Sequence, residues 1–114
     1  MSAITTHVLD LSDGRPAAGM AVVLERRAAG GEWIAVSERR TDADGRVRDL
    51  CPSAAPAAAG VYRLTFATGA YFAERNVRCF HPQVVVEFDL ADANRHHHVP
   101  LLLSPFGYST YRGS

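Results

Sequence analysis

Histidine is the residue type in this sequence best suited to chemistry near neutral pH, because its side chain gains and loses a proton there. Three of the five histidines are consecutive, at 96–98. On a strand, His96 and His98 would point to one side and His97 to the other. His7 stands in a β-branched segment far from that run. These residues allow acid–base catalysis, whereas their spacing alone favours a solvated strand start for the run and a structural role for His7.

A metal site is the second kind of chemistry that paired histidines could support. His96 and His98 could bind zinc together, but a zinc site needs at least one further protein ligand. No cysteine or carboxylate cluster near them supplies it, so we expect no metal site. Residues 42–45, DADG, resemble half of a calcium loop but lack the spacing of an EF-hand. His81 precedes a proline and is interpreted as a loop residue without a role.

The charged residues exclude several classes of protein. The 12 basic residues are all arginine and balance 12 acidic residues, so the net charge is +0. Without lysine there is no Schiff-base chemistry, and without a basic field there is no surface typical of nucleic-acid or anionic-lipid binding. Arg46 follows a turn glycine, and its simplest interpretation is a solvated charge. Cys51 and Cys79 stand in no metal or redox spacing, and no motif for a nucleophilic serine or a phosphate-binding loop occurs.

The elements that must hold these residues are predicted to be strands, because short apolar runs alternate with glycine, proline and aspartate. The expected strands cover residues 4–11, 19–28, 32–40, 61–68, 83–90, 95–104 and 107–112. Residues 70–77 could form one or two helical turns, and no helix is long enough for a βαβ crossover. The sequence therefore predicts an all-β sandwich or barrel of about eight strands, with residues 1–114 forming one domain.

Segment 99–106, VPLLLSPF, is very apolar for a stretch so near the end of a small chain. It could complete the core or line a contact between subunits, and a short apolar run does not show which. Pro100 lies inside this segment, and a proline in a strand is expected at a sheet edge or at a bulge.

The sequence contains no targeting or membrane signal that we can identify. The first residues, MSAITTHVLD, have no basic region followed by an apolar run, and no stretch approaches the roughly 20 apolar residues of a membrane span. We therefore expect a cytoplasmic protein whose two thiols stay reduced and which has no membrane partner.

Three blocks of the sequence resemble the hydroxyisourate hydrolases, also called transthyretin-like proteins. The blocks are THVLDLSDGRPAAGM at 6–20, TDADGR at 41–46 and HHHVPLLLSPFGYSTYRGS at 96–114. They occur in the family's order along nearly the whole chain. The last of them includes the tetrapeptide YRGS at 111–114, which separates these enzymes from transthyretin, the hormone carrier with the same fold.

The resemblance implies a two-sheet β-sandwich with one short helix, four copies assembled as a dimer of dimers, and active sites in a channel between the dimers. The implied reaction is hydrolysis of 5-hydroxyisourate, the product of urate oxidation, to 2-oxo-4-hydroxy-4-carboxy-5-ureidoimidazoline. Neither a metal nor an organic cofactor is implied, and the implied partners are the small-molecule substrate and further copies of the chain.

The resemblance also implies which residues form the site. It makes His7, Arg46 and His98 catalytic. The residues that it implies for substrate binding are His7, Arg46, Tyr111, Arg112 and Ser114. We expect His98 to act as general base on water with His7 as its proton partner, or the two in exchanged roles. Arg46 would hold the substrate and stabilise developing negative charge.

The chain departs from the family pattern at two positions where tyrosine is common, His97 and Phe106. His97 should face away from His98, and Phe106 lacks only a hydroxyl, so the expected site is unchanged. Two other functions stay open at this point: a transthyretin-like carrier of a small aromatic ligand, and an interaction domain without catalysis. The carrier predicts apolar residues at 7, 46 and 98, where this chain has ionisable ones.

Overall fold

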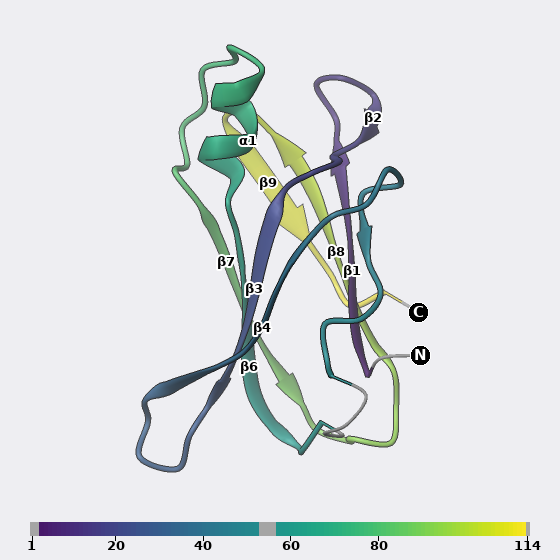
Figure 1. The fold of residues 1–114 in the computed structure, drawn as a ribbon, viewed down its shortest axis with the longest axis vertical. Coiled ribbons are helices and arrows are strands. Elements are labelled where there is room, and N and C mark those ends of the chain that lie inside the picture. Colours follow the sequence, from purple (N-terminus) through teal and green to yellow (C-terminus); the bar gives the residue numbers. More distant parts are fainter. Residues whose placement is uncertain (1–2, 53–56, 114) are drawn as a thin grey trace.

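Strands with one apolar face each form two sheets that pack face to face (Figure 1). The computed structural model describes residues 3–52 and 57–113. One sheet has the order β2-β1-β8-β9, with β5 also paired to β1, and the other has the order β4-β3-β6-β7. The elements are β1 (Ile4–Asp10), β2 (Arg15–Pro16), β3 (Ala21–Arg27), β4 (Trp33–Arg40), β5 (Arg46–Val47), β6 (Gly60–Phe66), α1 (Thr68–Glu74), β7 (Val84–Leu90), β8 (His97–Ser104) and β9 (Gly107–Thr110). The predicted all-β sandwich with one short helix is confirmed.

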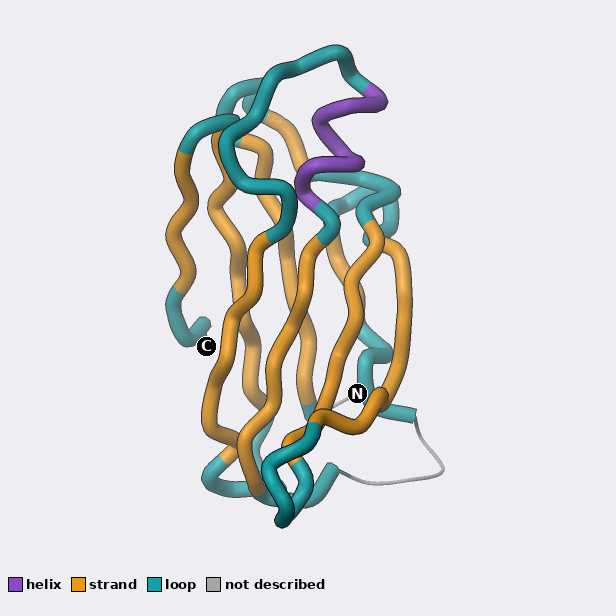
Figure 2. Tube along the Cα trace, turned by 90° about the vertical axis from the view of Figure 1, so that its left-hand side faces the viewer, coloured by secondary structure: helices purple, strands orange, loops and turns teal. Residues whose placement is uncertain are grey.

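The hydrophobic core lies between the two sheets, where alternate residues of each strand are buried. In β6, Tyr62, Leu64 and Phe66 are buried, as the period of two in a strand requires. In β1, Ile4 and Val8 are buried in the same core. Figure 2 shows the strands running side by side in both layers, with α1 closing one end of the sandwich. Each strand of this core therefore has a second face that is free to carry chemistry.

The helix α1 lies slightly earlier in the chain than predicted. It spans Thr68–Glu74 rather than 70–77. Tyr71 and Phe72 are buried on its inner side. The chain then turns at Asn76, whose positive φ of 57° is incompatible with a continuing right-handed helix. The helix therefore ends three residues before the predicted end.

Two strands escaped prediction because each has only two residues, too few to show a period. Both pair with β1: Arg15 lies opposite Asp10 in β2, and Arg46 lies opposite His7 in β5. Residue 46 had been interpreted only as following a turn. Its place in the sheet gives the guanidinium a defined neighbour, and this makes β5 the most consequential of the missed elements.

Every second residue of segment 99–106 up to Leu103 lies in the core. The interpretation that the segment completes the core is therefore confirmed for these residues. Val99, Leu101 and Leu103 are buried between the sheets. Leu102 points to the opposite face and is half-buried, and Phe106 is 65% exposed. The apolar composition of the segment therefore reflects a strand with apolar residues on both faces.

Pro100 lies in a central strand, so the expectation of a sheet edge is wrong. β8 is flanked by β1 and β9. The pairing of β8 with β9 ends at Leu101 and Thr110 and resumes only at the bridge between His98 and Gly113. The missing N–H of Pro100 falls in this gap, where the Thr110 hydroxyl donates to the Pro100 carbonyl at 2.7 Å. Proline is tolerated here because the ladder is already interrupted.

The buried carboxylate of Asp10 ties the turn after β1 to α1. Its Oδ1 accepts hydrogen bonds from the Ser12 N–H (3.0 Å) and hydroxyl (2.6 Å), and its Oδ2 accepts one from the Tyr71 hydroxyl (2.8 Å). Burial, followed by this hydrogen bond, raises the pKa of Tyr71 to about 12. The guanidinium of Arg75 covers the Tyr71 ring at 3.7 Å. Asp10 is therefore a structural member of the THVLD block.

We predict that Tyr71→Phe lowers the free energy of unfolding by about 1–3 kcal/mol at neutral pH, because it leaves the buried Asp10 carboxylate without one donor. Because the folded pKa is raised from 10.0 to about 12, this hydroxyl stabilises the fold fully below pH 10 and ceases to do so as pH rises through 12. In urea unfolding between pH 10 and 12, the free energy of unfolding of Tyr71→Phe should therefore fall less than that of the wild type. Tyr108→Phe, which alters an exposed ring, is the control. If the two substitutions lowered the free energy of unfolding equally at neutral pH, the prediction would be contradicted.

Candidate active site

The register of three strands brings His7, Arg46 and His98 onto one face. β1 and β5 are antiparallel with His7 opposite Arg46, and β1 and β8 are parallel with Thr5 opposite His98. Residues directly opposite each other in neighbouring strands point to the same side of a sheet. All four side chains therefore lie on the outer face of the five-stranded sheet, away from the core. The three residues predicted to be catalytic are brought together within a single chain.

The turn before β5 holds Arg46 through the carboxylate of Asp42. Asp42 Oδ1 accepts hydrogen bonds from the backbone N–H groups of Asp44 (2.9 Å) and Arg46 (3.0 Å). The bond from Arg46 is the main reason that the pKa of Asp42 lies below its ordinary value. Gly45, at φ 74°, lets this turn approach β1 so closely that a Cβ would collide with the Val8 carbonyl. The TDADGR block is therefore a rigid support that presents Arg46 to β1.

The imidazole of His98 is held from two sides. Its Nδ1 lies 2.7 Å from the Thr5 hydroxyl. The backbone of His98 is bound to the segment after β9, because the Gly113 N–H donates to the His98 carbonyl at 2.8 Å. A Cβ on Gly113 would lie only 2.7 Å from His98 Cδ2, so the segment after β9 can pack on the ring only with glycine at this position. The glycine of the YRGS block therefore has a steric role beside the ring.

The three consecutive histidines alternate as a strand requires. The Thr5 hydroxyl lies 2.8 Å from His96 Nε2 as well as 2.7 Å from His98 Nδ1, and the two rings stack with centroids 6.2 Å apart. His97 points away from them and is buried, with Nδ1 2.9 Å from the Arg95 carbonyl. The expectation that His97 faces away from His98 is confirmed. The solvated strand start that the spacing favoured describes His96 alone.

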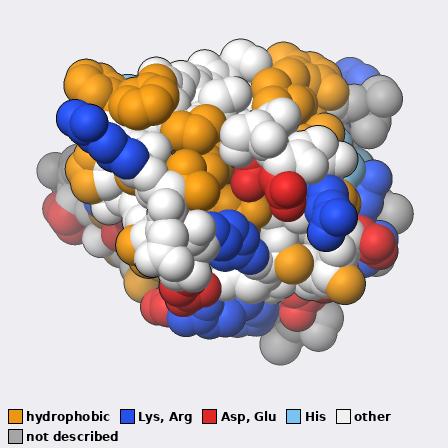
Figure 3. Space-filling model, turned by 90° about the horizontal axis from the view of Figure 1, so that it is seen from above, with side chains coloured by type: hydrophobic (Ala, Val, Ile, Leu, Met, Phe, Trp, Pro, Cys, Tyr) orange, Lys and Arg blue, Asp and Glu red, His pale blue; other side chains and the backbone are white. Residues whose placement is uncertain are grey.

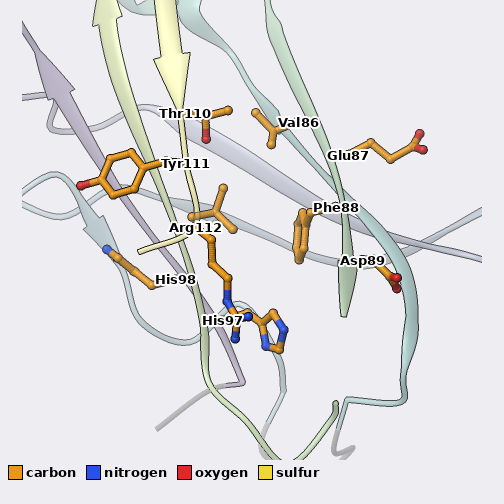
Figure 4. Close-up of a pocket in the computed structure, with 10 residues that line it drawn as sticks. Val86, Glu87, Phe88, Asp89, His97, His98, Thr110, Tyr111 and Arg112 are labelled. Carbon is orange, nitrogen blue, oxygen red and sulfur yellow. The ribbon is translucent and has the colours of Figure 1, made fainter. Parts of the chain in front are cut away.

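Tyr111 joins the face that carries the histidines. The pair Leu101 and Thr110 and the bridge between His98 and Gly113 have the same register. Tyr111, which lies between them, is therefore opposite Pro100. Pro100 in turn lies opposite His7 in β1. Tyr111 and His7 therefore occupy one row across the sheet, and Figure 4 shows the Tyr111 ring on the same side of the strand as His98.

Arg112 is placed differently from the other expected substrate-binding residues. In the same register it lies opposite Val99, a core-facing residue. It lines a cavity of about 310 Å³ at the edge of the sandwich, together with His97 and Phe88 (Figure 4). Tyr111 and His98 line the same cavity, so within one chain this cavity connects Arg112 with the row of Tyr111. Ser114 lies outside the described residues.

The rings of His7 and His98 both favour their neutral form. Burial and then the charge of Arg46 lower the pKa of His7, against smaller opposing effects that include a hydrogen bond with the Asp44 backbone. Burial, Arg46 and the two neighbouring imidazoles lower the pKa of His98. A neutral imidazole beside a guanidinium is a competent base at neutral pH. The neutral rings also stabilise the fold above pH 6.5, and this contribution is lost as pH falls.

Sequence reasoning missed three parts of this site: the Thr5 hydroxyl, the turn carboxylate of Asp42 and the packing of Gly113. Strand alternation already puts Thr5 on the same side as His7, which is the one signal that could have found it. Its partner His98 could not be found in this way, because the pairing joins residues separated by 93 positions.

The groups on this face can accept a proton from water and bind a planar, polar molecule. They are the imidazoles of His7, His96 and His98, a guanidinium with a forked set of donors, and a phenol. Within residues 3–52 and 57–113, no three histidine, cysteine or acidic side chains gather as a metal-binding group would. Neither Cys51 nor Cys79 is part of a disulfide among these described residues. In the same part of the chain no helix has the length and apolar character needed to cross a membrane.

Comparison with known proteins places this site in a family. The model of the HIUase/Transthyretin family matches residues 4–113. The chain belongs to this family. The matched segment contains His7, Arg46, His98 and Tyr111, so the outer face described above lies wholly within the family's domain.

Relatives within the family carry the name 5-hydroxyisourate hydrolase. The protein of that name from Salmonella dublin is 48% identical over 111 residues, which cover 97% of this chain and 80% of the relative. The one from Caulobacter vibrioides is 46% identical over 119 residues and is covered completely, as is this chain.

Solved structures of the family include both an enzyme and a carrier. Klebsiella pneumoniae 5-hydroxyisourate hydrolase has a TM-score of 0.83 and 40% identity, covering 100% of this chain and 94% of that one. Sea bream transthyretin in complex with thyroxine has a TM-score of 0.91 and 34% identity, covering 97% and 94%. The backbone alone therefore does not separate the two kinds of protein, and the side chains on the outer face must decide.

We predict that Arg46→Gln raises the pKa of both His7 and His98, because the guanidinium charge disfavours protonation of each ring. Titration of the histidine ring nitrogens by two-dimensional NMR measures this. Arg39→Gln removes a guanidinium paired with Asp49 and is the matched control, expected to leave both values in place. A variant at Arg46 with unchanged titration of both rings would show that the three groups do not share a face.

Proposed function

We propose that this protein hydrolyses 5-hydroxyisourate to 2-oxo-4-hydroxy-4-carboxy-5-ureidoimidazoline, a step of purine and urate degradation. Relatives at 40–48% identity are named 5-hydroxyisourate hydrolases, which supports this assignment. The observation that carries the proposal is the convergence of His7, Arg46 and His98 on one sheet face. A carrier of an apolar ligand needs no pair of neutral imidazoles beside a guanidinium, whereas a hydrolase does.

His98 is the general base in this proposal. The substrate is a planar, polar bicycle, and opening it breaks a cyclic C–N bond after water adds to the carbonyl carbon. His98 can take the water proton at neutral pH because burial and Arg46 keep its ring neutral. Its Nδ1 is engaged by Thr5, which leaves Nε2 to face the reacting water.

Arg46 and His7 complete the reaction. The guanidinium of Arg46 binds the carbonyl oxygen on which negative charge develops. His7, opposite it in β1, transfers the second water proton to the leaving ring nitrogen. In the alternative assignment His7 and His98 exchange these roles. Tyr111 donates a hydrogen bond to the substrate, and Ser114 helps to shape the pocket. Arg112 contacts substrate from the cavity that it lines together with Tyr111 and His98.

We further propose that four copies assemble as a dimer of dimers in the cytoplasm. The site is an open sheet face in one chain, and a second sheet facing it would enclose the substrate and exclude bulk water. β7 and β9 end their sheets, and large apolar side chains remain exposed at Leu11, Phe80, Phe106 and Tyr108. Figure 3, seen from the α1 end, shows exposed hydrophobic groups set among charged ones. Sedimentation equilibrium tests the tetramer directly.

We predict that His98→Ala lowers kcat by about 10²–10⁴-fold, the usual contribution of a positioned general base. The substrate is made in the cuvette from urate with urate oxidase, and the decay of its ultraviolet absorbance above the spontaneous rate is measured. His81→Ala is the control, because His81 packs against Phe80 and Tyr108 instead of the site. A wild-type protein that gives no acceleration would point to the carrier or interaction-domain alternatives, and an active His98→Ala would refute the base assignment.

We predict that Gly113→Ala lowers kcat at least 10-fold while the fold is retained, because the added Cβ forces the His98 ring out of place. The same absorbance assay measures it, with circular dichroism for the fold. Gly107→Ala is the control, since a Cβ there meets no atom within 4 Å. Equal rates for the two variants would show that the packing of Gly113 on His98 does not position the base.

A further inference from the structure

We infer that Thr5 and His96 form a proton relay that positions His98 and connects it to solvent. The inference rests on the proposed function, which makes His98 the base. The carrying observation is a single hydroxyl placed between two imidazole nitrogens, 2.7 Å from His98 Nδ1 and 2.8 Å from His96 Nε2.

A hydroxyl between two such nitrogens couples their protonation. Thr5 has one proton to donate and lone pairs to accept, and a neutral imidazole has one N–H and one acceptor nitrogen. If Thr5 donates to His96 Nε2, it must accept from His98 Nδ1–H. That arrangement leaves His98 Nε2 without a proton, which is the tautomer that a base requires. When His96 carries its own proton on Nδ1, it therefore selects the reactive form of His98.

The placement of the three groups suits conduction towards solvent. Thr5 is buried, at 6% exposure, whereas His96 lies on the exposed segment before β8. His98 lies between these extremes and faces the outer side of the sheet. A proton received by His98 can thus leave the enclosed face through one hydroxyl and reach water at His96.

The relay step balances without any further reactant. As His98 Nε2 takes a proton from water, His98 Nδ1 gives its proton to Thr5 Oγ1, and Thr5 gives its own to His96 Nε2. The water oxygen forms its bond to the carbonyl carbon at the same time. As the C–N bond breaks, His7 carries the second water proton from the adduct hydroxyl to the ring nitrogen, and the proton at His96 passes to solvent. The sum is water added to the cyclic amide, with the new carboxyl group ionised.

The neighbouring threonine shows what an ordinary structural hydroxyl does in this strand. Thr6 Oγ1 donates to the Val99 carbonyl at 2.6 Å, a single bond to backbone within the core. Thr5 makes no comparable bond to a carbonyl in the described chain, and its two partners are both titratable side chains. The pair Thr5 and Thr6 therefore offers matched variants of the same chemistry on opposite faces of β1.

The experiment compares kcat and KM of Thr5→Val, Thr5→Ser and Thr6→Val by the absorbance assay. Thr5→Val should lower kcat about 10-fold or more with little change in KM, since it removes a proton path and no substrate contact. Thr5→Ser should restore kcat to near the wild-type value, because it keeps the hydroxyl. Thr6→Val should lower stability while sparing kcat.

His96→Gln separates relay from mere positioning, because glutamine can hydrogen-bond Thr5 but cannot accept a proton. Its kcat should fall, and added imidazole should restore part of it. The lower pKa of the kcat/KM profile should rise, because the charge of His96 holds down that of His98. The other titratable groups facing His98 are His7 and Arg46 from β1 and β5 and Tyr111 from the segment after β9. All three are unchanged in this variant.

Nitrogen-15 NMR of the histidine rings reads the relay independently of turnover. The wild type should show His98 protonated at Nδ1, and Thr5→Val should shift the proton to Nε2. Should the wild type accelerate no hydrolysis, the proposed function fails while this tautomer result still tests the coupling. The relay is overturned if Thr5→Val keeps both the wild-type kcat and the wild-type tautomer of His98. It is also overturned if His96→Gln keeps the wild-type kcat. If Thr5→Val does not fold, Thr5→Ser and His96→Gln provide the test.

Discussion

The parallel pairing of β1 with β8 is the constraint on which the site depends. It joins residues separated by more than 90 positions and sets Thr5 opposite His98 and Pro100 opposite His7. Because side chains alternate along a strand, a shift of one residue would turn these groups into the core. The buried faces of Ile4, Val8 and Leu101 prevent that shift, so hydrophobic packing on one side of the sheet fixes the chemistry on the other.

Electrostatics on this outer face follow from the same register. A guanidinium placed opposite one imidazole and near a second disfavours the protonated form of both rings. The positive charge therefore keeps both imidazoles unprotonated at neutral pH, and in the proposed reaction it offers a donor fork to an oxyanion. The turn at Asp42 stabilises this arrangement, because the Asp42 carboxylate accepts a hydrogen bond from the Arg46 N–H and so holds Arg46 at the sheet.

The similarity to transthyretin shows how little of the function lies in the backbone. Sea bream transthyretin superimposes with a TM-score of 0.91, above the 0.83 of the Klebsiella pneumoniae enzyme. In this chain the proposed function depends on side chains of one sheet face and on the segment after β9 that packs on it. Gly113 illustrates this, since the space beside His98 exists only because residue 113 has no side chain.

By itself the sequence determined the all-β class, the longer strands and the sides to which His96, His97 and His98 point. Its resemblance to the family added the residues that we expect in the site. Strand alternation and apolar runs are local properties, so they can be read from neighbouring residues. Only the tertiary structure decided that Arg46 belongs to a strand, that Pro100 fits a central one, and that Thr5 bridges two histidines. Each of these depends on which strands pair and in what register, and that is settled by packing between segments far apart in the chain.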